Sequence, residues 1–139
     1  YEAIFPELAQ KQVQRGANVL VNISNDAWFG RSSAPWQHLH LSVLRAVEQN
    51  RAIIRSTNSG LSAFIAPDGS LSGPTSLYST EVMHDPSIPL LTETTFYHEH
   101  FFFIHAAFPL LALPLLWALW RRGRKNHTEP RTSCCNIPN

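Results

Sequence analysis

Apolar positions recur with helical spacing in two segments of the chain. Residues 6–15 are predicted to form a helix, because Pro6 suits the first helical position and Gly16 suits the C-terminal stop. A second helix is predicted over residues 35–49, with Ser33 as its N-cap. Its apolar face is expected to comprise Trp36, Leu39, Val43, Leu44 and Val47.

Short β-branched, apolar runs between and after these helices are typical of buried strands. They fall at residues 19–23, from Ile53–Ile54 onward, at 61–66 and at 90–94. The turn at residues 67–70 contains Pro and Gly, which favour its backbone geometry, and residues 73–89 read as an irregular connection. Helices alternating with buried strands predict an α/β layer architecture.

The segment 101–120 is different, because it contains no Asp, Glu, Lys or Arg. A helix of this length spans roughly 30 Å, the hydrocarbon thickness of a bilayer. Pro109 and Pro114 would be tolerated in a membrane helix, although they also fit the alternative of a buried hairpin. Trp117 and Trp120 suit the interface at the membrane surface. We therefore expect one transmembrane helix.

Charge is distributed unevenly around this segment. Residues 1–120 carry a net charge of −3 and residues 121–139 carry +4. By the positive-inside bias, the basic end faces the cytoplasm. The predicted organisation is a domain at residues 1–95, a membrane helix at 96–120 and a basic, disordered tail at 121–139. Cys134 and Cys135 lie in that tail, where no role is indicated for them.

Several short motifs follow one another in the first half of the chain. They are Tyr1-Glu2-x-x-Phe5-Pro6-Glu7, Asn25-Asp26-Ala27-Trp28-Phe29-Gly30, Gln37-His38, Arg45-Ala46-x-Glu48-x-x-Arg51 and Arg55-x-Thr57-Asn58. This series resembles the apolipoprotein N-acyltransferases, the integral-membrane branch of the nitrilase (carbon–nitrogen hydrolase) superfamily. The resemblance runs from Tyr1 to about Gly69 and includes the membrane helix.

The resemblance implies the C-terminal part of a nitrilase-like αββα sandwich followed by one transmembrane helix. It also implies a Glu–Lys–Cys triad that moves an acyl chain from a phospholipid, through a Cys thioester, to the N-terminal diacylglyceryl-cysteine of a lipoprotein. The Cys would directly precede Tyr1, and the Glu and Lys would lie further upstream. This chain alone is therefore expected to be inactive and not to fold by itself.

The same resemblance assigns roles to individual residues. Tyr1 and Glu2 would flank the nucleophile, although Glu2 would equally suit a structural pair with an arginine. Asn25, Asp26, Trp28 and Phe29 would line the acyl pocket, with simple loop packing as the alternative. Structural support is expected from His38, Arg45, Glu48 and Arg51, with Arg45 and Glu48 paired and Arg51 and Arg55 facing buried carboxylates.

Other chemistry is not indicated. His98, His100 and His105 do not complete a set of metal ligands, so no metal and no cofactor are expected. The basic residues form no nucleic-acid-binding motif. The expected partners are a phospholipid acyl donor, a diacylglyceryl apolipoprotein and the membrane.

Two alternatives to the acyltransferase hypothesis stay open. One is a membrane-tethered carbon–nitrogen hydrolase, an amidase in which water opens the thioester. The other is a degenerate nitrilase-like module without catalysis. The leading hypothesis implies a bacterial inner-membrane protein with a periplasmic domain and a cytoplasmic tail.

Overall fold

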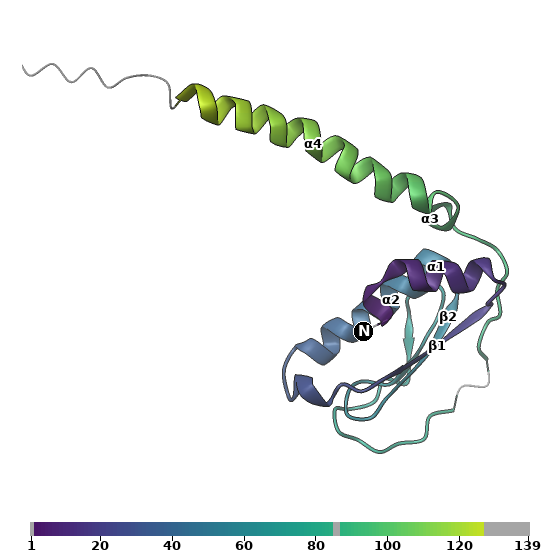
Figure 1. Ribbon diagram of the computed structural model, residues 1–139. Coiled ribbons are helices and arrows are strands. Elements are labelled where there is room, and N and C mark those ends of the chain that lie inside the picture. The colour runs from purple at the N-terminus through teal and green to yellow at the C-terminus, as the bar shows by residue number, and fades with distance from the viewer. Residues whose placement is uncertain (1, 85–86, 127–139) are drawn as a thin grey trace, which may run out of the picture. The chain divides into compact units, whose positions relative to one another are not determined.

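The computed structural model describes residues 2–84 and 87–126, and the chain divides into two units, Tyr1–Glu99 and His100–Asn139 (Figure 1). The first unit contains a sheet and its covering helices. The second contains one long helix. The division falls after Glu99, and the domain boundary at residue 95 stays a prediction.

The first unit is built on a four-stranded mixed sheet in the order β1-β2-β3-β4. Its strands are β1 (Val19–Ser24), β2 (Ala52–Thr57), β3 (Ala63–Ile65) and β4 (Leu71–Ser72). β1 and β2 are parallel and joined through a helix, whereas β3 and β4 add antiparallel. The predicted α/β architecture is thus confirmed.

Two helices, α1 (Pro6–Gln14) and α2 (Ala34–Gln49), pack on the same face of this sheet (Figure 1). The register places Leu20, Ile53 and Ile65 side by side on that face. They form the core together with Ala9, Val13, Leu39, Ala46, Leu61 and Ala63. Three short helical segments complete the unit: η1 (Glu2–Ile4), η2 (Ala27–Phe29) and α3 (Phe96–Glu99).

The opposite face of the sheet is largely open in this chain. Val21 is 62% exposed and Ile23 is 77% exposed, although both are apolar strand residues. Ile54 and Phe64, which share that face, are half-buried. Apolar strand residues that alternate with core residues normally pack against a second layer.

The predicted apolar face of α2 is wrong for Trp36, Leu44 and Val47, which are about half exposed. Polar residues turn inward instead, because a buried arginine on β2 needs hydrogen-bond partners there. The buried residues of α2 are Pro35, His38, Leu39, Ser42, Arg45, Ala46 and Gln49. Ser33 does occupy the N-cap, but it is the Ser32 hydroxyl that accepts a bond from the Ala34 N–H (3.2 Å).

The strand predicted at residues 90–94 is also wrong, because none of those residues belongs to a strand. Instead, backbone carbonyls in this stretch accept hydrogen bonds from an arginine side chain. β4, which was not predicted, follows the turn at residues 67–70. Gly69 takes a φ of +87° there, as the turn requires.

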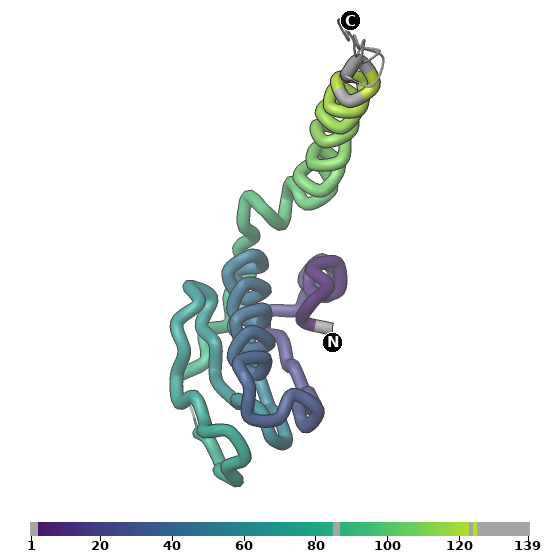
Figure 2. The backbone as a smooth tube through the Cα atoms, turned by 90° about the vertical axis from the view of Figure 1, so that its left-hand side faces the viewer, coloured from purple at the N-terminus to yellow at the C-terminus, as the bar shows by residue number. Residues whose placement is uncertain are grey.

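The second unit is the helix α4 (Phe101–Asn126), which continues through Pro109 and Pro114 as one coil, green to yellow in Figure 2. The hairpin alternative is therefore wrong. Residues Phe101–Arg122 are long and apolar enough to cross a membrane, judged by length and composition. The helix extends beyond residue 120, so the disorder predicted from residue 121 is wrong as far as Asn126. Cys134 and Cys135 lie outside the described residues.

Candidate functional site

The loops that follow the parallel strands β1 and β2 meet at one edge of the sheet. The side-chain oxygen of Asn58, after β2, accepts a bond from the Asp26 N–H (3.2 Å), and its Nδ2 donates to Asn25 Oδ1 (2.8 Å). Ligands in open α/β sheets bind at the carboxyl ends of the strands. Hydrogen bonds thus hold the two loops together at the predicted position of the site.

Asp26 lies at the centre of this edge with its side chain fully buried. Its Oδ2 pairs with the guanidinium of Arg55 at 2.9 Å, and the Arg55 side chain is also fully buried. Its Oδ1 accepts from Ser24 Oγ (2.6 Å) and contacts His38 Nδ1 (3.0 Å). Both carboxylate oxygens thus have protein partners. Direct contact of Asp26 with a substrate stays a prediction.

Arg55 organises the inner side of the same network. It donates to the Leu61 carbonyl (3.2 Å), to Ser42 Oγ (3.1 Å) and to Asn22 Oδ1. Burial lowers the pKa of Arg55, while Asp26 acts in the opposite direction. The hypothesis that Arg55 faces a buried carboxylate is confirmed. Asn22 and Ser42 were missed, although Asn22 interrupts an otherwise apolar strand run.

His38 is held by this network through one ring nitrogen. Its Nδ1 lies 3.0 Å from Asp26 Oδ1, an acceptor, and 3.1 Å from Arg55 Nη2, a donor, so this nitrogen contacts both members of the Asp26–Arg55 pair. Nε2 is buried and has no hydrogen-bond partner among the described residues. Burial lowers the pKa of His38, Arg55 lowers it further, and Asp26 opposes both effects. A lowered pKa favours the neutral form of the imidazole.

A mostly apolar pocket of about 120 Å³ lies beside His38. The Phe29 and His38 rings pack edge-to-face with their centroids 5.7 Å apart. The Trp28 and Phe29 rings pack in the same way, with their centroids 6.2 Å apart. Trp28 is 63% exposed, and substrate binding by Trp28 and Phe29 stays a prediction. The pocket is lined by Ile4, Trp28, Phe29, Ala34, Gln37, His38 and Leu41. It thereby joins the loop after β1, the start of α2 and η1.

Arg45 fixes the backbone of η1 against α2. Its Nη1 donates to the carbonyls of Ala3 (3.4 Å) and Ile4 (3.3 Å), and its Nη2 pairs with Glu48 at 2.7 Å. The predicted Arg45–Glu48 pair is confirmed. Tyr1 lies outside the described residues, as does the side chain of Glu2.

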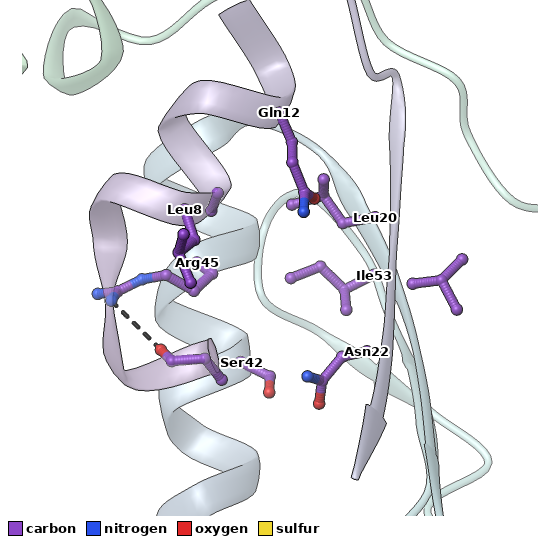
Figure 3. A pocket seen from close by; sticks show the side chains of 10 residues that line it. Leu8, Gln12, Leu20, Asn22, Ser42, Arg45 and Ile53 are labelled. Carbon is purple, nitrogen blue, oxygen red and sulfur yellow. Dashed lines mark hydrogen bonds between the residues drawn. The ribbon is translucent and has the colours of Figure 1, made fainter. Parts of the chain in front are cut away.

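A second hollow lies between α1, β1 and α2, next to the Arg55 network. Figure 3 shows Asn22 and Ser42 at one end of it and Gln12 at the other, with Arg45 bonded to the Ala3 carbonyl at its side. Asn22 and Ser42 both contact Arg55. The polar end of this hollow is thus an extension of the buried network.

Arg51 serves a different region. It donates to the backbone carbonyls of Ala17 (2.9 Å), Thr92 (3.0 Å) and Glu93 (2.6 Å), and burial lowers its pKa. The expectation that Arg51 faces a buried carboxylate is wrong, because carbonyl oxygens fill that role. Arg51 thus supports the structure by linking Ala17, just before β1, to residues 92–93, which lead into α3.

The histidines near α4 do not form a metal centre in the described part of the chain, where no group of three potential ligands occurs. His98 Nδ1 contacts Gln49 Oε1 at 2.6 Å, and its carbonyl accepts from Gln10 Nε2 (2.8 Å). His105 Nδ1 contacts the carbonyl of Phe101 (2.9 Å). His98 thus links α3 to α1 and α2, whereas the His105 contact lies within α4.

Comparison with known proteins agrees with this arrangement. Residues 1–85 match the carbon–nitrogen hydrolase family. The chain is 46% identical over 84 residues to the apolipoprotein N-acyltransferase of Geobacter metallireducens, a match covering 60% of this chain and 16% of that protein. It is 36% identical over 129 residues to that of Vibrio vulnificus (91% and 24%), and 37% identical over 125 residues to that of Azotobacter vinelandii (88% and 23%).

The chain thus spans between 16% and 24% of the length of these relatives. The family match covers the sheet, both covering helices, and the loops that carry Asp26, Trp28, Phe29 and Asn58. With its α/β sheet and its buried Asp26–Arg55 network, the chain belongs to the carbon–nitrogen hydrolase family.

Proposed function

We propose that this chain forms part of an apolipoprotein N-acyltransferase, in which it holds the segment that follows the nucleophile and builds one wall of the acyl pocket. The observation that carries the proposal is the apolar pocket in which η1 meets Trp28, Phe29 and His38. The similar proteins are named apolipoprotein N-acyltransferases, and the matches to those of Vibrio vulnificus and Azotobacter vinelandii cover 91% and 88% of this chain, so they extend into both units.

The proposed reaction has two covalent steps. A Cys thiolate at the position before Tyr1 attacks the ester carbonyl of a phospholipid; a C–S bond forms and the C–O bond breaks, and the departing lysophospholipid oxygen takes a proton. The α-amine of a diacylglyceryl-cysteine then attacks the thioester; a C–N bond forms, the C–S bond breaks to release the thiolate, and the amine gives up a proton to a base. A thiolate attacks an ester more readily than an amine does, and the thioester is opened easily.

Residues of this chain have positioning and binding roles in that scheme. The backbone N–H of Tyr1 would donate to the oxyanion, and Glu2 would assist proton transfer or orient the amine. Trp28 and Phe29 contact the acyl chain, while Asn25 and Asp26 hold their loop. Arg45 holds the carbonyls of Ala3 and Ile4, and so sets the path of the chain just after the nucleophile.

The membrane arrangement is part of the proposal. We expect α4 to cross the bacterial inner membrane with its Arg-rich end in the cytoplasm and the first unit in the periplasm. A fluorescent protein fused after Asn139 should then fluoresce, and alkaline phosphatase fused there should be inactive. The opposite pattern would reverse the orientation.

The first test is the codon that precedes Tyr1 in the gene. A Cys codon, with codons for a Glu and a Lys further upstream, supports the acyltransferase. Any other residue at that position overturns the proposal and favours the non-catalytic module.

The second test uses the protein translated from the complete reading frame. Trp28→Ala and Phe29→Ala should each lower acyl-enzyme formation from phospholipid by about tenfold or more, because each removes apolar contact of about 1.4 kcal/mol or more. Trp36→Ala is the matched control, since Trp36 is a half-exposed tryptophan that does not line the pocket. Release of free fatty acid without N-acylated peptide would instead show that water opens the thioester, as the hydrolase alternative requires.

A further inference from the structure

The C-terminal end of α4 carries an ordered stripe of two tryptophans and two arginines. The guanidinium carbon of Arg121 lies 3.9 Å from the ring centroid of Trp117, and that of Arg124 lies 4.1 Å from the ring centroid of Trp120. The four residues are spaced i, i+3, i+4 and i+7, so they share one face of the helix. Arg122 is displaced from that face by one residue. We call these four residues the Trp–Arg stripe.

Stacking prepares the two arginines to bind an anion. A cation–π contact uses the flat face of the guanidinium and leaves its N–H edges directed outwards. Those edges donate two parallel hydrogen bonds to a phosphate. No Asp or Glu occurs anywhere in the sequence of α4, so the helix itself provides no carboxylate to neutralise them. A shallow hollow lined by the stripe and Arg122 leaves room for a ligand.

The position of the stripe selects the kind of anion. The apolar segment ends at Trp120, and Arg121 follows directly. Indole rings favour the membrane interface, where lipid headgroups carry their phosphates. Arg121 and Arg124 differ in height by about 4.5 Å along the helix. They thus lie at successive levels from the lipid carbonyls out to the phosphates.

We propose that the Trp–Arg stripe is a binding site for the phosphate headgroup of an anionic phospholipid. The proposal rests on the membrane placement of α4 given above, but not on acyl transfer. Arg121 and Arg124 bind the headgroup phosphate, and Trp117 and Trp120 keep those two arginines in position by stacking. Arg122 also lines the hollow.

The test measures the association of spin-labelled phosphatidylglycerol, relative to spin-labelled phosphatidylcholine, with the protein translated from the complete reading frame in phosphatidylcholine bilayers. Arg121→Gln and Arg124→Gln should each lower this preference by about fivefold, the effect of one arginine at a charged surface. Arg15→Gln is the matched control and should change it by less than about twofold, because Arg15 is an exposed arginine that does not line the hollow. The double variant Trp117→Leu with Trp120→Leu keeps every charge and should still lower the preference for phosphatidylglycerol. The double variant Arg121→Lys with Arg124→Lys should lower this preference as well.

Three results would overturn the site. An equal loss in Arg15→Gln would show a diffuse charge effect with no built site. An unchanged preference in the Trp double variant would show that stacking has no role. Loss of the preference on adding millimolar inorganic phosphate at constant ionic strength would show a site for soluble anions. Removal of the protein from the bilayer by alkaline extraction would overturn the membrane placement of α4. Alkaline extraction does not depend on lipid preference, so it distinguishes failure of the membrane placement from failure of the headgroup site.

Discussion

The carboxylate of Asp26 contacts three side chains that come from three different elements. Ser24 belongs to β1, His38 to α2 and Arg55 to β2. A Cβ atom on Gly60 would lie 2.3 Å from Asp26 Oδ2, so the chain after β2 approaches as closely as a glycine allows. A single buried carboxylate therefore sets the distance between the loops that form the candidate site.

Replacement of Asp26 by Ala should destabilise the carbon–nitrogen hydrolase domain by about 3–5 kcal/mol, because Arg55 would stay buried without its counter-charge. The measurement is the unfolding midpoint of the protein translated from the complete reading frame, in detergent. Asp68→Ala is the control, since Asp68 is an exposed turn residue and its loss should destabilise the domain far less. Equal effects of the two substitutions would refute a central role for Asp26.

His38 should make the domain sensitive to mild acid. Its pKa in the folded protein lies below the ordinary value of 6.5, so between these two values the unfolded chain binds more protons than the folded one. Stability is therefore complete above pH 6.5 and falls as the pH decreases below it. The pKa of His98 is also lowered, chiefly by burial. His98 therefore also contributes to the loss of stability at lower pH.

The measurement is the unfolding midpoint between pH 7.5 and 5. His38→Gln should flatten that dependence, and His38→Gln with His98→Gln should flatten it further. His40→Gln should leave the dependence intact because His40 is exposed. A wild-type midpoint that does not change over this range would contradict the assignment.

At the scale of elements, α2 is the organising helix of the first unit. Its inward side contacts the core through Leu39 and Ala46, and contacts polar networks through His38, Ser42 and Arg45. Its end is tied by Arg51 to the segment that leads into α3. The helix thus connects η1, the site loops and the returning chain.

Arg51→Ala should release that returning segment. Its guanidinium satisfies the carbonyls of Thr92 and Glu93, and charged hydrogen bonds of this kind are worth about 1.5–3 kcal/mol each. Hydrogen exchange of amides in residues 92–99 should accelerate by about tenfold or more, whereas the exposed control Arg15→Ala should leave it unchanged. Arg51→Lys should not protect the segment, because an ammonium lacks the planar fork of donors.

At the scale of the whole molecule, the sheet has one covered face and one open face. Exposed Val21 and Ile23 would need a second layer to be removed from water. Membership of the carbon–nitrogen hydrolase family agrees with a further layer on that face. The domain should therefore depend on packing beyond these 139 residues.

The 139-residue chain, purified alone in detergent, should show no cooperative thermal unfolding of its sheet-containing unit. Far-ultraviolet circular dichroism should still report helix from α4, while the near-ultraviolet signal of fixed aromatic packing should be weak. The complete protein serves as the comparison and should unfold cooperatively. A single sharp transition in the isolated chain would contradict this prediction.

The sequence by itself determined those features whose physical cause is local. The α/β order, the long apolar helix, the Arg45–Glu48 pair and the turn at Gly69 all follow from periodicity, spacing or backbone conformation. Family membership was indicated by the order of short motifs and confirmed by comparison.

Only the tertiary structure decided which side of α2 is buried. The inward side contains His38, Ser42 and Arg45 because buried Arg55 and the η1 carbonyls require polar partners. It also decided that residues 92 and 93 satisfy Arg51 instead of forming a strand, and that Asp26, Ser24, His38 and Arg55 meet. Such pairings join residues far apart in sequence, and hydrophobic periodicity contains no information about which buried polar groups satisfy one another.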